Sequence, residues 1–99
     1  MTTPSYGGYM PDVERIRDES IELPSAYQTW LEYWETVQNQ QAIKCCNSRC
    51  LEKAELGCFV RTKMTHETFV TALCPLCVID TNKKVHVTKR LLVKKPYTQ

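Results

Sequence analysis

Six cysteines are the residues of this 99-residue chain whose type and spacing could do chemistry. They form two clusters and one single residue, namely Cys45, Cys46 and Cys50, then Cys58, then Cys74 and Cys77. Thiolates are the preferred ligands of structural zinc, which takes four of them at tetrahedral corners. Two paired clusters of this kind predict a metal site before a set of disulfides.

We predict that two pairs supply the four ligands. Cys74-Pro-Leu-Cys77 brings two sulfur atoms to one side of a metal without straining the chain. Cys45 and Cys50 form the second pair, with Cys46 as the alternative to Cys45. Between the pairs lie 23 residues, enough for a hairpin that returns the chain to the metal. A structural Zn²⁺ bound by four thiolates is the cofactor expected here.

Other uses of the cysteines remain open at this stage. The Cys74 and Cys77 pair also has the spacing of a thioredoxin-like redox motif, and four thiolates also bind iron–sulfur clusters. In a secreted chain, six cysteines would instead predict three disulfides. Cys58 follows a glycine in a strand-like segment, so a buried apolar role is expected. His66 and His86 stand alone, which favours solvated or structural histidines.

Composition and charge fit a single compact domain of an ordinary soluble protein. Apolar residues make up 42% of the chain and charged residues 24%, with no apolar run long enough to span a membrane. The first residues lack the basic start and apolar stretch of a signal peptide, so we expect a cytoplasmic protein with reduced thiols. Reduced thiols favour metal binding over disulfides.

The charge is distributed unevenly. Residues 1–43 hold two basic and seven acidic side chains, whereas residues 44–99 hold eleven basic and four acidic ones. We therefore expect an acidic, helical N-terminal segment at 1–43 and a basic zinc-binding module at 44–99, within one domain.

Two helices are expected in the acidic segment. A short one begins at Pro11 and runs to Glu19, with proline at its first position and early acidic residues. The main helix begins after Ser25, which with Gln28 matches a capping box, and continues to about Gln41. Its aromatic and apolar residues recur at helical spacing, so the helix is predicted to be amphipathic.

The aromatic stripe of this helix has two interpretations. Tyr27, Trp30 and Trp34 are typical of a face packed against the rest of the domain. Trp and Tyr also anchor protein interfaces, so the same three residues are the candidate partner-binding residues.

The basic half predicts a different set of elements. Residues 56–60 and 68–73 have the composition of paired strands in a hairpin. Residues 77–82 suit a short helix or turn, and residues 84–93 a closing strand. The fold class expected is therefore α+β.

This half resembles the treble-clef zinc module of the HNH endonucleases. The resemblance rests on Cys45-x4-Cys50, Leu56-Gly-Cys-Phe-Val and Phe69-Val-Thr-Ala-Leu-Cys-Pro-Leu-Cys77, and covers residues 44–95. It implies a β-hairpin, a short helix and a terminal strand around a structural zinc ion.

One departure from that family changes what the resemblance implies. The hairpin histidine that acts as general base in active relatives corresponds to Phe59, which cannot accept a proton. We therefore expect no enzyme activity and no small-molecule substrate, with an HNH-type nuclease as a remote alternative.

The end of the chain offers a nucleic-acid hypothesis. Six cations fall within 13 residues, namely Lys83, Lys84, Lys89, Arg90, Lys94 and Lys95. Such a cluster could neutralise phosphates and give salt-sensitive binding to DNA or RNA, although lysines also protect ordinary strand edges.

Taken together, these features predict a non-catalytic zinc protein that binds and modulates a protein partner. Its size and polarised charge suit a phage-type factor acting in the host cytoplasm, and nucleic-acid binding through the basic half is the alternative.

Overall fold

The protein is an α+β fold built on one antiparallel sheet. The computed structural model describes residues 12–16, 21–62, 67–79 and 85–96. The elements in chain order are β1 (Asp12–Arg15), α1 (Trp30–Gln38), β2 (Leu56–Thr62), β3 (Thr68–Leu73), α2 (Pro75–Ile79), β4 (Val85–His86), the 3₁₀ helix η1 (Lys89–Leu91) and β5 (Val93–Lys94). The strand order is β4-β1-β2-β3-β5.

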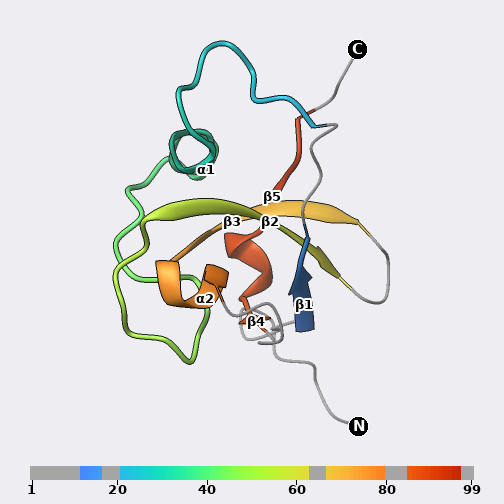
Figure 1. Cartoon of the computed structure of the whole chain (residues 1–99). Helices are drawn as coiled ribbons and strands as arrows, with labels where there is room; N and C mark the ends of the chain where they lie inside the picture. The colour runs from blue at the N-terminus through green and yellow to red at the C-terminus, as the bar shows by residue number, and fades with distance from the viewer. Residues whose placement is uncertain (1–11, 17–20, 63–66, 80–84, 97–99) are drawn as a thin grey trace, which may run out of the picture.

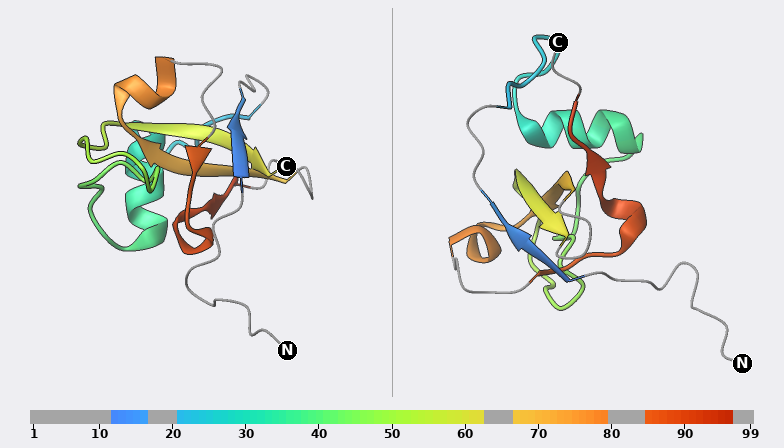
Figure 2. Two further views of the ribbon diagram at one scale, coloured as in Figure 1. Left: turned by 90° about the horizontal axis from the view of Figure 1, so that it is seen from below. Right: turned by 90° about the vertical axis from the view of Figure 1, so that its right-hand side faces the viewer.

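The two helices cover opposite faces of this sheet (Figures 1 and 2). Helix α1 packs on β2, β3 and β5, while α2 lies on the other face. The core between these layers includes Val60, Val70 and Leu73, none of which has any exposed surface. The central β2–β3 hairpin therefore supports both faces.

The predicted hairpin is confirmed. Strands β2 and β3 pair antiparallel from Leu56 opposite Leu73 to Arg61 opposite Thr68. β-branched and aromatic residues that fit a pleated, half-buried surface fill both strands.

The short helix expected at residues 11–19 is wrong, because Asp12–Arg15 forms strand β1. This strand inserts between β2 and β4, with Val13 opposite both Thr62 and Val85. Val13 is fully buried there. An isolated two-turn helix is marginal in water, so pairing with two strands and burial of Val13 outweigh local helix propensity.

Helix α1 begins four residues later than predicted. Its N-cap is Thr29, whose hydroxyl accepts a hydrogen bond from the Glu32 backbone N–H at 3.0 Å. The Gln28 backbone N–H donates to Glu32 Oε1 at 3.1 Å. Thr29 and Glu32 match the same capping-box pattern as Ser25 and Gln28, so the pattern alone did not distinguish the two starts.

The helix also ends earlier than expected, at Asn39. Asn39 has a left-handed backbone with φ 56°, a conformation that asparagine tolerates better than most residues. The next N–H, of Gln40, bonds to Glu35 O at 3.1 Å and so closes the helix end.

Close contact between α1 and β2 depends on Gly57. A Cβ atom at this position would lie 2.4 Å from the Trp30 carbonyl carbon and 2.5 Å from the Leu31 nitrogen. Both are backbone atoms that cannot move without shifting the helix. Glycine is therefore required for α1 to approach the sheet this closely.

The closing strand expected at residues 84–93 is wrong as a single element. Strands β4 and β5 lie at opposite edges of the sheet, with η1 between them. A chain that pairs at both edges must cross the sheet, and the Leu91 carbonyl is held during that crossing by Thr71 Oγ1 and Trp34 Nε1. The short helix begins at Pro75, before the predicted 77, because proline is well tolerated at a first helical position.

Within the part of the chain that the structure describes, neither helix has the length and apolarity needed to cross a bilayer.

Candidate metal centre

Four cysteines from two distant segments bring their sulfur atoms together. The Sγ atoms of Cys45, Cys50, Cys74 and Cys77 all lie within 4.8 Å of one another. Cys45 and Cys77 are 3.8 Å apart, and Cys50 and Cys74 are 3.5 Å apart. A disulfide requires about 2.05 Å, so these are free thiols close enough to hold a metal ion.

A small hairpin positions the first pair. In this knuckle hairpin, defined as residues 43–54, Cys45 N–H donates to Glu52 O at 2.8 Å and Ala54 N–H donates to Ile43 O at 3.0 Å. The turn is closed by Cys50 N–H donating to Asn47 O at 2.9 Å. These bonds direct Cys45 and Cys50 toward the same point.

The second pair lies where β3 runs into α2. Cys74 follows the last residue of β3, and Cys77 lies in the first turn of α2, where its N–H donates to Cys74 O at 3.1 Å. Cys74 and Cys77 have 1% and 0% of their surface exposed. The end of a rigid strand thus fixes one ligand and the helix start fixes the other.

Hydrogen-bond donors surround the sulfur atoms. The Cys74 N–H donates to Cys45 Sγ at 3.3 Å, and the Asn47 side-chain amide donates to Cys77 Sγ at 3.4 Å. Backbone bonds from Asn47, Glu52 and Cys77 to the sulfurs of Cys45, Cys50 and Cys74 add to them. Such donors stabilise thiolates and are typical of the outer shell of a metal site.

Burial and these donors act on the thiols in opposite directions. Burial raises the pKa of Cys45 well above its ordinary value and outweighs the hydrogen bonds to its sulfur. At Cys74, burial also raises the pKa, but the bonds from Cys77, Cys50 and Cys45 together leave it below its ordinary value. The Cys74 thiol therefore loses its proton more readily than the Cys45 thiol.

The other two cysteines lie outside the cluster. Cys46, the predicted alternative to Cys45, is buried beside Thr71, and its N–H donates to Ala72 O at 2.8 Å. Neighbouring residues of an extended chain point in opposite directions, so only Cys45 reaches the other three thiols. Cys58 is half-buried, and burial raises the pKa of its thiol to about 11.

The aromatic stripe predicted to bind a partner lies mostly against the sheet. Trp34 has only 2% of its surface exposed, and its Nε1–H donates to Leu91 O at 2.9 Å. Trp30 and Tyr27 are half-buried, and their rings meet Tyr33 edge-on. Trp34 is therefore a core residue in this fold, and partner binding through Tyr27 and Trp30 stays a prediction.

Phe59 on β2 makes an apolar contact with α1. The Phe59 ring lies 4.8 Å from that of Trp30, at an interplanar angle of 66°. Its ring contributes to the attachment of α1 to β2.

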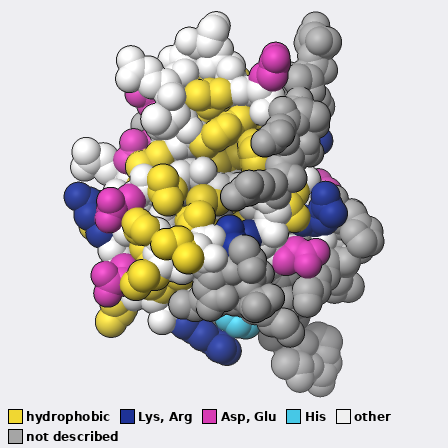
Figure 3. All heavy atoms as spheres, in the orientation of Figure 1, with side chains coloured by type: hydrophobic (Ala, Val, Ile, Leu, Met, Phe, Trp, Pro, Cys, Tyr) yellow, Lys and Arg dark blue, Asp and Glu magenta, His cyan; other side chains and the backbone are white. Residues whose placement is uncertain are grey.

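The predicted cation cluster lies on the last elements. Lys89 and Arg90 are exposed on η1, and Lys94 and Lys95 are exposed at and after β5. Lys83, Lys84 and His66 lie outside the described residues. The face drawn in Figure 3 carries positive and negative side chains around a band of hydrophobic ones. Nucleic-acid binding stays a prediction.

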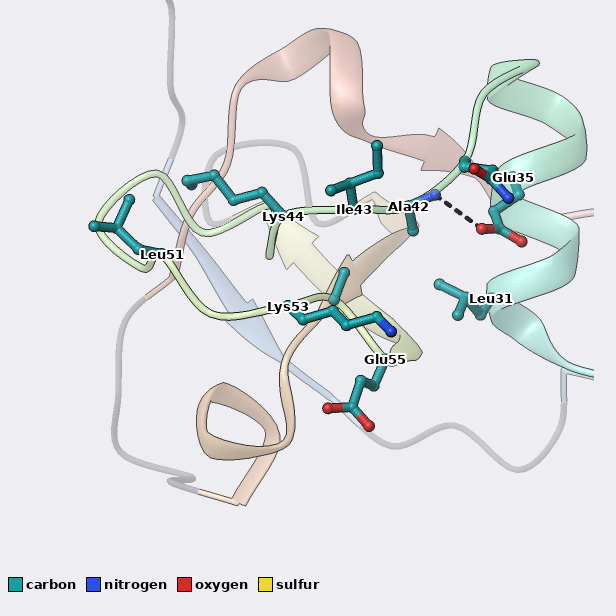
Figure 4. Close-up of a pocket in the computed structure, with 10 residues that line it drawn as sticks. Leu31, Glu35, Ala42, Ile43, Lys44, Leu51, Lys53 and Glu55 are labelled. Atoms are coloured by element: carbon teal, nitrogen blue, oxygen red, sulfur yellow. Dashed lines mark hydrogen bonds between the residues drawn. The ribbon is translucent and has the colours of Figure 1, made fainter.

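A groove that was not predicted from the sequence lies between α1 and the knuckle hairpin (Figure 4). It has a volume of about 750 Å³, with Leu31 and Glu35 of α1 on one side and the two arms of the hairpin on the other. Ile43 and Leu51 line it and are 72% and 87% exposed. Asn47 was not predicted as a site residue from the sequence either. Its position between cysteines of the first cluster is the sequence feature that could have indicated it.

The chain matched no family model, no curated protein and no solved structure in comparisons with known proteins.

Proposed function

We propose that the chain is a non-catalytic protein whose four cysteines hold one structural Zn²⁺. The sulfur–sulfur distances carry this proposal. A tetrahedral zinc ion with bonds of about 2.3 Å to sulfur has edges of about 3.8 Å between its ligands. Two of the pairs lie at 3.8 and 3.5 Å and all four sulfurs lie within 4.8 Å of one another, so a modest inward movement would let them bind the ion.

The same distances argue against the competing metal chemistries. An iron–sulfur cluster distributes its four cysteine ligands over two or four irons, which holds most pairs of cysteine sulfurs farther apart than a single ion does. Thiolates are soft ligands that favour zinc over the harder magnesium or calcium. A single zinc ion is therefore the occupant that fits the donor set.

The role proposed for the ion is structural. Four cysteine ligands fill a tetrahedral shell and leave no position for a substrate or an activated water. The ion would join the knuckle hairpin to the β3–α2 junction, in addition to the bonds from Cys46 N–H to Ala72 O and from the Asn47 amide to Cys77 Sγ. The order of knuckle, hairpin and helix supports a treble-clef module, and Phe59 supports one without nuclease chemistry.

We further propose that this zinc protein binds an apolar segment of another protein in the groove beside α1. Ile43 and Leu51 are large apolar side chains that expose most of their surface at this groove. The charged residues that line it are of both signs, namely Lys44, Lys53, Glu35 and Glu55. A mixed rim suits a protein segment better than a phosphate backbone, which would be repelled by the carboxylates.

Replacing Ile43 with aspartate is expected to weaken binding of the partner by at least about tenfold. Burying a carboxylate in place of an apolar side chain costs at least about 1.4 kcal/mol, which corresponds to that factor. Ile79→Asp is the matched control, because Ile79 has 74% of its surface exposed and lies outside the groove.

The measurement begins with capture from nuclease-treated lysate by the zinc-loaded protein and continues with calorimetry on the purified partner. Equal affinity of the two variants would contradict the groove as the binding surface. Loss of all captured protein after nuclease treatment, together with steep weakening by salt, would favour the basic residues of η1 and β5 instead.

A further inference from the structure

Asn47 is a buried polar residue at the point where the knuckle hairpin meets α2 and β4. Only 1% of its surface is exposed. Its side-chain nitrogen Nδ2 donates to Cys77 Sγ at 3.4 Å. Its side-chain oxygen Oδ1 accepts the backbone N–H groups of Arg49 and His86, each at 3.3 Å. Both ends of the amide are therefore used.

These contacts fix which way the amide points. Oδ1 faces two backbone N–H donors, so turning the amide over would set its NH₂ group against both of them. The nitrogen is consequently the atom directed at the sulfur. Because the amide is neutral, it can donate to a thiolate without adding charge to the site.

The backbone around Asn47 also joins the knuckle hairpin to β4. Ser48 N–H donates to His86 O at 2.7 Å, and Asn47 forms an isolated antiparallel bridge with Val87. Strand β4 is thus attached on one side to β1 and on the other to the hairpin that carries Cys45 and Cys50.

Four thiolates around a divalent cation leave two excess negative charges at the centre. Hydrogen bonds to the sulfurs spread this charge and orient the ligands, and their loss typically lowers metal affinity by about 10–100-fold. Of the donors described at this cluster, Asn47 Nδ2 is a side chain and not a backbone group, so substitution can remove it without altering the main chain.

We propose that Asn47 is a positioning residue of the metal centre, which orients the Cys77 thiolate and couples metal binding to the seating of β4. This proposal rests on the zinc site proposed above. When the ion is bound, Cys77 and the knuckle are held together and Asn47 Oδ1 presents a fixed acceptor to the His86 N–H. When the ion leaves, this acceptor loses its fixed position and β4 loosens from the hairpin.

Two substitutions separate the functions of the amide. Asn47→Asp keeps an oxygen for the Arg49 and His86 N–H groups but removes the donor and sets a carboxylate against Cys77. Asn47→Ala removes the donor and the acceptor together. Ser48→Asp is the control for charge, because Ser48 is the next residue and its side chain is exposed.

Zinc affinity is measured by competition with a chromogenic chelator. Asn47→Asp is expected to bind zinc at least about tenfold more weakly than the unsubstituted protein, and Ser48→Asp within about threefold of it. If Asn47→Asp does not fold at saturating zinc, the zinc affinity of Asn47→Ala is compared with that of the unsubstituted protein instead. Equal affinities of the variants and the unsubstituted protein would overturn the proposal.

Amide hydrogen exchange of the zinc-loaded proteins measures how far the attachment of β4 depends on the Asn47 side chain. The His86 amide should exchange at least about tenfold faster in Asn47→Ala, and its exchange should change much less in Asn47→Asp, which keeps the acceptor. Unchanged exchange of His86 in Asn47→Ala would overturn the coupling. Failure of the unsubstituted protein to bind zinc would contradict the proposed function itself, so the two failures are distinguishable.

Discussion

Replacing Cys77 with serine is expected to remove the metal and to abolish cooperative unfolding of the protein. Cys77 is fully buried, and its sulfur lies 3.8 Å from that of Cys45. A serine hydroxyl is a poor zinc ligand, and the apparent binding free energy of a structural zinc site is about 10–16 kcal/mol. A domain of this size is stable by about 5–15 kcal/mol in total, so loss of the ion removes most of that stability.

Metal content by native mass spectrometry and melting by circular dichroism measure this effect. Cys46→Ala is the matched control, because Cys46 is also buried but lies outside the four-thiol cluster. It should lose some packing and keep one ion per chain. Retention of the ion and of a cooperative melt by Cys77→Ser would contradict the structural role, and metal loss in Cys46→Ala would make Cys46 a ligand.

Replacing Trp34 with alanine is expected to lower the free energy of unfolding by about 3–5 kcal/mol. The indole is 98% removed from solvent, and it joins α1 to η1 through its bond to Leu91 O. Removing it leaves a cavity under α1 and takes from the Leu91 carbonyl one of its two donors, the other being Thr71 Oγ1. Trp34→Phe keeps most of the volume but loses the bond, at a cost of about 1 kcal/mol beyond the change in packing.

Urea unfolding at saturating zinc separates this effect from metal loss. Trp30→Phe serves as the comparison, because Trp30 lies on the same helix and is only half-buried. The change should cost less than Trp34→Ala by at least about 2 kcal/mol. A loss below about 1 kcal/mol for Trp34→Ala would mean that the indole is not a core side chain.

The four clustered cysteines could be predicted because metal-binding pairs are recognised by their local spacing. Cys74 and Cys77 are separated by two residues, and Cys45 and Cys50 by four, so each pair is positioned by its own turn. Local spacing could not show whether Cys45 or Cys46 joins the cluster. That depends on which of the two side chains faces the other thiols, and the bond from Cys46 N–H to Ala72 O fixes the chain so that Cys45 does.

The elements that were predicted wrongly are those that tertiary pairing determines. Residues 12–15 have little preference of their own and become a strand because β2 and β4 offer partners on both sides. The closing strand is divided because its two halves pair at opposite edges of the sheet. The groove at Ile43 and Leu51 depends on the distance between α1 and the knuckle hairpin, which no sequence pattern encodes.

The most direct test of a single zinc ion held by four cysteines is X-ray absorption spectroscopy at the zinc edge of the purified protein. We expect one zinc per chain and a first shell of four sulfur atoms at about 2.3 Å. A first shell containing nitrogen or oxygen, a metal–metal distance typical of a cluster, or a protein without zinc would contradict it.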